Sequence, residues 1–142
     1  MRYNNINIIG SKKFQEQTVK ALDLIKGKSK NDFNKIKKYL RKIKSAQISG
    51  MILEKAQFDV SNKNAFNSLE WYASAIVPDI HHYYLHTIKN LPWRKGNMAK
   101  HETLCVAEQV KFLKKIKASK ELIDYTKNTL KTKFWYVKNR TW

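Results

Sequence analysis

The chain has 142 residues, of which 42% are hydrophobic, 12% aromatic and 28% charged. This composition excludes a disordered tail and indicates one globular domain over residues 1–142, long enough to build a core without disulfides. A single cysteine excludes a disulfide framework and a cysteine-based zinc finger, and a net charge of +18 favours anionic partners.

Two amphipathic helices are predicted in the first third of the chain. Ser11 is suited to cap the first helix, whose apolar residues keep helical spacing up to Gly27. Ser29 or Asn31 caps the second, whose apolar stripe extends as far as Ile43 and whose opposite face is rich in lysine. We interpret the lysine-rich face first as a solvated surface, with contact to nucleic acid or to a membrane as the alternatives.

Residues 47–60 break the helical pattern. A turn at Ser49-Gly50 separates short segments of β-prone residues, which predicts a short β-hairpin or an irregular strand segment. A long helix is then predicted from Ala65 towards His86, with Pro78 in its path. Because proline removes a backbone donor, either the helix kinks at Val77 or a new helix begins at Pro78.

The last third of the chain is predicted to be helical as well. One helix runs from His101 to Lys117, and Ser119 caps a final helix with an acidic residue in its first turn. The aromatic tail, residues 134–142, is expected to pack back on the body. The fold class is therefore mainly α, α+β at most, in the form of a single-domain bundle of about five helices.

Histidines and acids gather in the middle of the chain. All four histidines lie within residues 81–101, with Asp79 and Glu102 at the borders of this segment, and residues 45–110 carry as many acidic as basic side chains. In a helical H-E-x-x-H motif, ligands at i and i+4 leave one helix face and the acid between them acts as general base. Asp79 and His82 stand in the second and fifth positions of such a motif, and Pro78 stands in the first.

The runs Trp71–His82 and His101–Gln109 resemble the zincin-type metallopeptidase-like domains found among bacterial toxins and effectors. Those domains carry H-D/E-x-x-H on one helix and a glutamate ligand on a later one, as thermolysin-like enzymes also do. The resemblance implies zinc as cofactor, Asp79 as general base, His82 as a zinc ligand and Glu102 as the downstream carboxylate ligand.

The departure from the motif lies at Pro78, which cannot bind a metal ion. Three repairs are open: Asp79 becomes a ligand, His86 moves the site by one helical turn, or His81 turns inward. A catalytic zinc normally has three protein ligands and an open water position. Without a repair the chain would be a pseudo-enzyme that keeps the scaffold for binding.

The expected function is a metal-dependent hydrolase that cleaves an amide in a peptide or protein substrate. As a toxin-type effector it would have an immunity or carrier protein as partner. The chain shows neither a membrane span nor a signal peptide, so the expected location is the cytoplasm, or a target cell reached without a classical signal.

A purely structural role of the histidines and two other functions are the alternatives to this interpretation. In the structural role, the histidines cover a helix end and are hydrogen-bonded to tyrosine hydroxyls or carboxylates. Cys105 is expected to be a small core residue rather than a nucleophile. The main alternative function is a basic helical nucleic-acid-binding module, with Trp93, Trp135, Tyr136 or Trp142 stacking on bases. Attachment to an anionic membrane surface is a third option.

Overall fold

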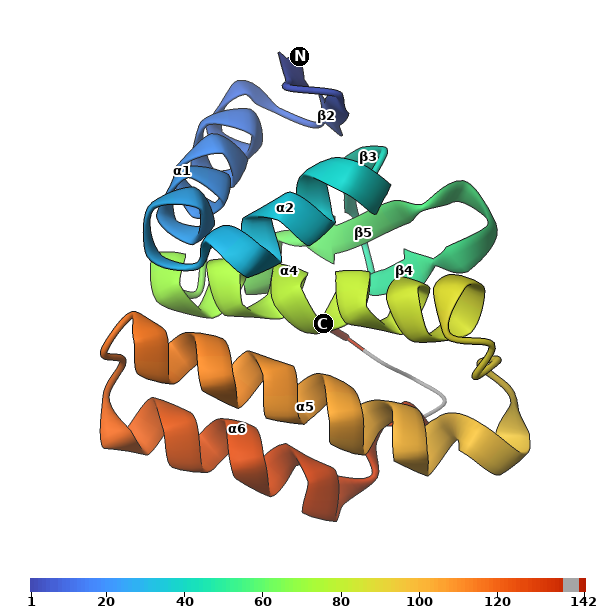
Figure 1. The fold of residues 1–142 in the computed structure, drawn as a ribbon. Helices are drawn as coiled ribbons and strands as arrows, with labels where there is room; N and C mark the ends of the chain where they lie inside the picture. The colour runs from blue at the N-terminus through green and yellow to red at the C-terminus, as the bar shows by residue number, and fades with distance from the viewer. Residues whose placement is uncertain (137–140) are drawn as a thin grey trace.

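The described residues, 1–136 and 141–142 of the computed structural model, form a mixed β-sheet and a stack of helices (Figure 1). The strands are β1 (Arg2–Tyr3), β2 (Ile6–Ile9), β3 (Lys42–Ala46), β4 (Gly50–Ile52) and β5 (Gln57–Ser61). The α-helices are α1 (Lys12–Lys28), α2 (Lys30–Tyr39), α3 (Asn62–Ala65), α4 (Leu69–Tyr83), α5 (Met98–Lys115) and α6 (Lys120–Thr132). Short 3-10 turns cover Leu53–Lys55, Lys95–Asn97 and Phe134–Tyr136, and a π-helical turn, Tyr84–Ile88, follows α4.

The sheet has the strand order β1-β2-β3-β5-β4. Its central strands β2, β3 and β5 are parallel, and each edge strand is antiparallel to its neighbour. The register places Ile8, Ile43 and Phe58 in one row across the parallel strands, and each is at most 1% exposed. These residues form the part of the hydrophobic core that the sheet contributes, because β-branched and aromatic residues pack well on one face of a pleated sheet.

Helix α4 lies at the centre of the helical stack (Figure 1). It packs against α1 and α2 on one side and against α5 on the other, and α6 covers the far face of α5. Ser68 caps α4 by accepting a hydrogen bond from the backbone N–H of Trp71 at 3.0 Å. Tyr72, Ile76 and Ile80 from α4 enter the same hydrophobic cluster as the sheet residues.

Most of the predicted architecture is confirmed. The protein is mainly helical, and β4 and β5 form the antiparallel pair expected within residues 47–60. Ser11 and Ser119 cap their helices, accepting from the N–H groups of Phe14 and Leu122. The tail packs back on the body as far as the structure describes it: Ser49 N–H donates to the carbonyl of Trp142 at 2.8 Å. Residues 137–140, inside the predicted tail, lie outside the described residues.

The sheet is larger than predicted, and one helix is shorter. The apolar stripe placed Ile43 on the second helix, but α2 ends at Tyr39 and Ile43 lies in β3. Leu40 is extended, with ψ at 132°, and Arg41 N–H bonds to the carbonyl of Ala56. Pairing of β3 with two neighbouring strands therefore overrides the local helical spacing, and both Leu40 and Ile43 are buried in this arrangement.

Pro78 lies within α4, so the prediction of a new helix beginning at this residue is wrong. Proline in a helix interior costs about 3 kcal/mol because one backbone hydrogen bond is lost. Val77 and Ile80 beside it are each 1% exposed, and their burial offsets this cost. The helix then carries His82 to the interface with α5.

Candidate functional site

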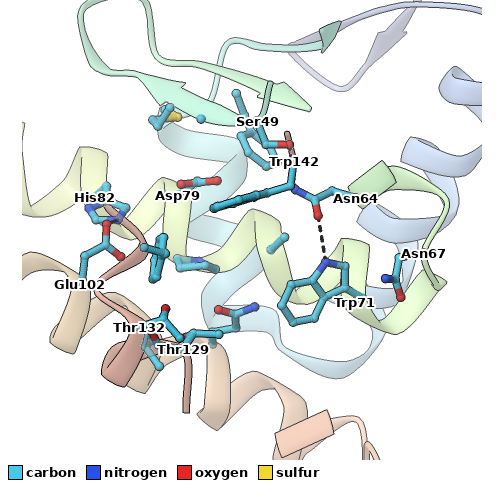
Figure 2. Close-up of a pocket in the computed structure, with 18 of the residues that line it drawn as sticks. Ser49, Asn64, Asn67, Trp71, Asp79, His82, Glu102, Thr129, Thr132 and Trp142 are labelled. Atoms are coloured by element: carbon cyan, nitrogen blue, oxygen red, sulfur yellow. Dashed lines mark hydrogen bonds and ion pairs between the residues drawn. The ribbon is translucent and has the colours of Figure 1, made fainter. Parts of the chain in front are cut away.

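A pocket of about 830 Å³ lies between the sheet edge and helices α4, α5 and α6 (Figure 2). Edge strand β4 forms one border, and Trp142 from the tail forms part of the wall. Figure 2 shows Asp79, His82 and Glu102 on one side of the pocket, with Trp71 and Asn67 on the opposite side. Carboxylates, an imidazole, amides and aromatic rings therefore share a space that could hold several residues of a peptide.

His82 and Glu102 are brought together, as the resemblance implies. Nε2 of His82, near the end of α4, lies 3.2 Å from Oε1 of Glu102, in the second turn of α5. The side chains are 12% and 8% exposed, so the pair is largely shielded but reaches the pocket. Such a pair forms a charge-assisted hydrogen bond when the imidazole carries a proton on Nε2.

The other nitrogen of the same imidazole faces His101. Nδ1 of His82 lies 3.0 Å from Nδ1 of His101, and Nε2 of His101 lies 2.5 Å from the backbone oxygen of Leu91. His101 is fully buried, and burial lowers the pKa of its imidazole below the usual range. The indole of Trp93 packs edge-on against both imidazoles, with ring centroids 5.1 Å and 5.3 Å apart.

Cys105 lies behind the pocket wall and forms, with His82 and His101, a cluster of nitrogen and sulfur side chains. It follows His101 by one helical turn, is fully buried, and forms no hydrogen bond among the described residues. One ligand atom each from His82, His101 and Cys105 lie within 4.8 Å of one another, so this group could hold a metal ion. Burial, with the nearby acids including Glu102, raises the pKa of the thiol well above its usual range, which does not favour a free nucleophilic thiolate.

The remaining predicted site residues lie in different places. Asp79 lines the pocket one helical turn before His82. His86 lies outside the cluster: its Nδ1 accepts the backbone N–H of Trp93 at 2.8 Å. His81 turns to another side, where its Nδ1 lies 3.2 Å from Nζ of Lys35.

The sequence interpretation did not identify His101 and Cys105 as metal ligands. Their separation of four positions was the available signal, because residues at i and i+4 leave the same helix face. The H-E-x-x-H pattern instead favoured candidates for the missing ligand on the segment of α4 and the turn after it. The structure instead offers the additional donors from α5.

None of the helices in the described part of the chain has the length and apolar character needed to cross a bilayer. Comparison of the chain with protein-family models, with curated proteins and with solved structures gave no match.

Proposed function

We propose that the protein is a zincin-like metal-dependent hydrolase that acts on an amide bond of a peptide held in the pocket. The observation that carries this proposal is the position of His82. Its imidazole contacts a carboxylate at the pocket wall on one side and buried donors on the other. His82 is thus the ligand around which a metal ion could be held next to the substrate space.

The pocket residues support hydrolysis rather than simple burial of polar groups. A zinc ion at this position would act as a Lewis acid and lower the pKa of a bound water molecule. Asp79 and Glu102 both line the pocket and provide carboxylates that can accept a proton from water. Amide and aromatic side chains on the opposite wall, including Asn67 and Trp71, suit the backbone and side chains of a peptide.

Zinc-dependent cleavage of unstructured peptides tests this proposal. A peptide mixture is incubated with zinc-loaded and chelated protein, and new termini are detected by mass spectrometry. We expect Asp79→Asn to reduce cleavage by about 10²–10⁴-fold, the usual contribution of a positioned general base. Asp124→Asn, which makes the same change on exposed α6, is the matched control and should leave cleavage unchanged.

Absence of cleavage by zinc-loaded protein would overturn the hydrolase proposal and leave a metal-binding pseudo-enzyme. Because Pro78 occupies the first ligand position of the motif, this outcome has a physical reason. The toxin-type role rests on the resemblance of the α4 and α5 sequences alone. It includes delivery into a target cell and an immunity or carrier protein.

A separate observation favours binding of a nucleic acid as a second candidate function. The ring of Tyr84 has Nζ of Lys35 at 4.7 Å and Nζ of Lys89 at 5.6 Å from its centroid. Among the described residues, neither lysine forms an ion pair with a carboxylate. An aromatic ring with two ammonium groups near it, neither of them paired with a carboxylate, suits a base and its phosphates.

Fluorescence anisotropy with a labelled single-stranded RNA tests this second candidate. The affinity should fall steeply with salt and should be insensitive to chelators. Lys35→Gln combined with Lys89→Gln should weaken binding, and the pair Lys127→Gln and Lys131→Gln on α6 provides a control with the same charge change. Equal losses in both double variants would show only nonspecific attraction to a basic protein.

A further inference from the structure

We propose that the buried cluster is a metal site of defined composition, with Nδ1 of His82, Nδ1 of His101 and Sγ of Cys105 as the ligands. Glu102 and the carbonyl of Leu91 then orient the two imidazoles and do not bind the ion. This inference concerns how the metal is held. It does not depend on hydrolysis, because a site of this kind can also be purely structural.

The hydrogen bond to Leu91 fixes which nitrogen of His101 is available. A backbone carbonyl can only accept, so Nε2 of His101 must carry the proton in the 2.5 Å contact. The ring is fully buried, and burial favours the neutral imidazole. A neutral imidazole protonated on Nε2 has its lone pair on Nδ1, and this atom faces His82.

The same reasoning applies to His82. The carboxylate of Glu102 lies 3.2 Å from Nε2 and accepts a hydrogen bond from its N–H. Nδ1 of His82 is then the atom left for an ion, and it lies 3.0 Å from Nδ1 of His101. An ion between the two Nδ1 atoms would take the place of the hydrogen bond that joins them.

Both orienting contacts match those of metal-bound imidazoles in general. Histidine ligands almost always donate their second N–H to a carboxylate or to a backbone carbonyl, which fixes the ring and increases the basicity of the ligand nitrogen. His82 has the carboxylate of Glu102 in this position, and His101 has the carbonyl of Leu91. The outer contacts of a histidine metal site are therefore complete around this pair.

Cys105 supplies the third donor and selects the type of metal. Its thiol is fully buried and has no hydrogen-bond partner among the described residues. If the thiol bound a metal as a thiolate, the positive charge of the ion would compensate the buried negative charge. Nitrogen and sulfur donors favour zinc or similar transition metals over magnesium or calcium. Residues at i and i+4 of α5 thus provide the ligands that Pro78 does not provide on α4.

Binding of an ion would require an adjustment of the ligands. A tetrahedral zinc ion about 2.0–2.1 Å from each nitrogen needs the nitrogens roughly 3.3 Å apart, slightly more than the 3.0 Å observed. One ligand atom from each of the three residues lies within 4.8 Å of the others, and the sulfur would have to lie nearer to the nitrogens, roughly 3.6 Å from each, to share the ion. Pocket access through His82, which is 12% exposed, provides a route for the metal.

Metal titration of the full chain tests the ligand set, with Co²⁺ as a spectroscopic probe. We expect the native protein to bind a single equivalent and to show a sulfur-to-cobalt charge-transfer band together with the visible bands of a tetrahedral ion. Cys105→Ser should lose the charge-transfer band, and His101→Gln should weaken zinc binding at least about 100-fold. Glu102→Gln, which alters an orienting contact, should weaken it by about 10–100-fold.

His81→Gln is the matched control, because His81 lies on the same helix as His82 but its imidazole faces Lys35, outside the cluster. It should leave stoichiometry, affinity and spectrum unchanged. Circular dichroism in the presence of chelator confirms folding of each variant, and Cys105→Ala replaces Cys105→Ser where the serine variant does not fold.

The inference is overturned if the native protein binds no metal, if the charge-transfer band survives loss of Cys105, or if His81→Gln weakens binding as much as His101→Gln. None of these measurements involves peptide cleavage. A protein that binds the ion as described but cleaves nothing would refute the hydrolase proposal and leave this site standing.

Discussion

The imidazole planes of His82 and His101 are nearly parallel, only 9° apart, with ring centroids separated by 5.3 Å. The rings come from helices that are separated by the π-helical turn and the loop after it, and Trp93 of that loop covers both of them. The loop, helix α4 and helix α5 therefore meet at one contact between polar aromatic side chains, those of Trp93, His82 and His101. Changes at this point are expected to affect stability as well as metal binding.

Removal of the indole over the imidazoles should expose the cluster. Trp93→Ala is expected to destabilise the protein by roughly 2 kcal/mol, less than for a fully buried tryptophan because Trp93 is only partly buried. It should also increase the rate at which Cys105 reacts with Ellman's reagent in chelated protein. Unchanged thiol reactivity would mean that Trp93 does not shield the cluster.

Metal removal should lower thermal stability if the cluster binds zinc in the native state only. At a free zinc concentration of about 100 Kd, the linkage relation gives about 2.7 kcal/mol of added stability, or a melting temperature higher by roughly 5–10 °C. Differential scanning fluorimetry with and without chelator measures the shift. The Cys105→Ser variant should show a much smaller response to zinc than native protein does.

Replacement of the proline within α4 separates helix stability from ligand supply. Pro78→Ala restores a backbone donor and should stabilise the protein by up to about 3 kcal/mol. Pro78→His should gain part of this stability and should also place an additional imidazole at the pocket wall. We expect only the histidine variant to show increased zinc-dependent cleavage, and denaturant unfolding measures the stability of both.

The buried hydroxyl pair between α1 and α4 offers a test of the core. Thr18 Oγ1 donates to the carbonyl of Phe14 at 2.8 Å, so the hydroxyl of Tyr72 must be the donor in its 2.6 Å contact with Thr18. Tyr72→Phe should therefore cost about 1 kcal/mol in unfolding free energy. Thr18→Val should cost more, about 1–3 kcal/mol, because it leaves the buried tyrosine hydroxyl without an acceptor.

Acid sensitivity is expected from His81. Burial, together with the positive charge of Lys35, lowers the pKa of His81 from 6.5 to about 4 in the folded protein. As pH falls from about 6.5 to about 4, the unfolded chain takes up a proton that the folded chain does not, so the folded state loses stability. His81→Gln should make the pH dependence of unfolding shallower over this window in chelated protein, and an unchanged dependence would contradict the assignment.

Local signals in the sequence predicted much of the fold. Ser11 and Ser119 marked helix starts correctly, because a capping hydroxyl acts on the first turn of its own helix. Ile43 was misplaced because its neighbours in β2 and β5 are distant in sequence, and helical spacing alone cannot reveal them. Strand β2 was missed for the same reason, since it pairs with the distant β3, and the two-residue strand β1 is too short to give a pattern of its own before it pairs with β2.

The sequence likewise predicted one part of the candidate site and left another part open. The motif and the resemblance pointed to the approach of His82 and Glu102. Tautomers and ring orientation, on which the choice of ligand nitrogen depends, come from contacts such as that between His101 and the Leu91 carbonyl. Those contacts depend on the path of the loop between α4 and α5, which no spacing in the sequence specifies.

The hydrogen bond from Ser49 to the carbonyl of Trp142 has a consequence for any ligand of the pocket. The side chain of Trp142 occupies part of the cavity and belongs to the same chain (Figure 2). A ligand that needs this volume therefore competes with an intramolecular group at high effective concentration. We therefore expect the affinity for such a ligand to depend on displacement of Trp142 from the cavity. Release of this side chain should change the tryptophan emission and report occupancy without a label.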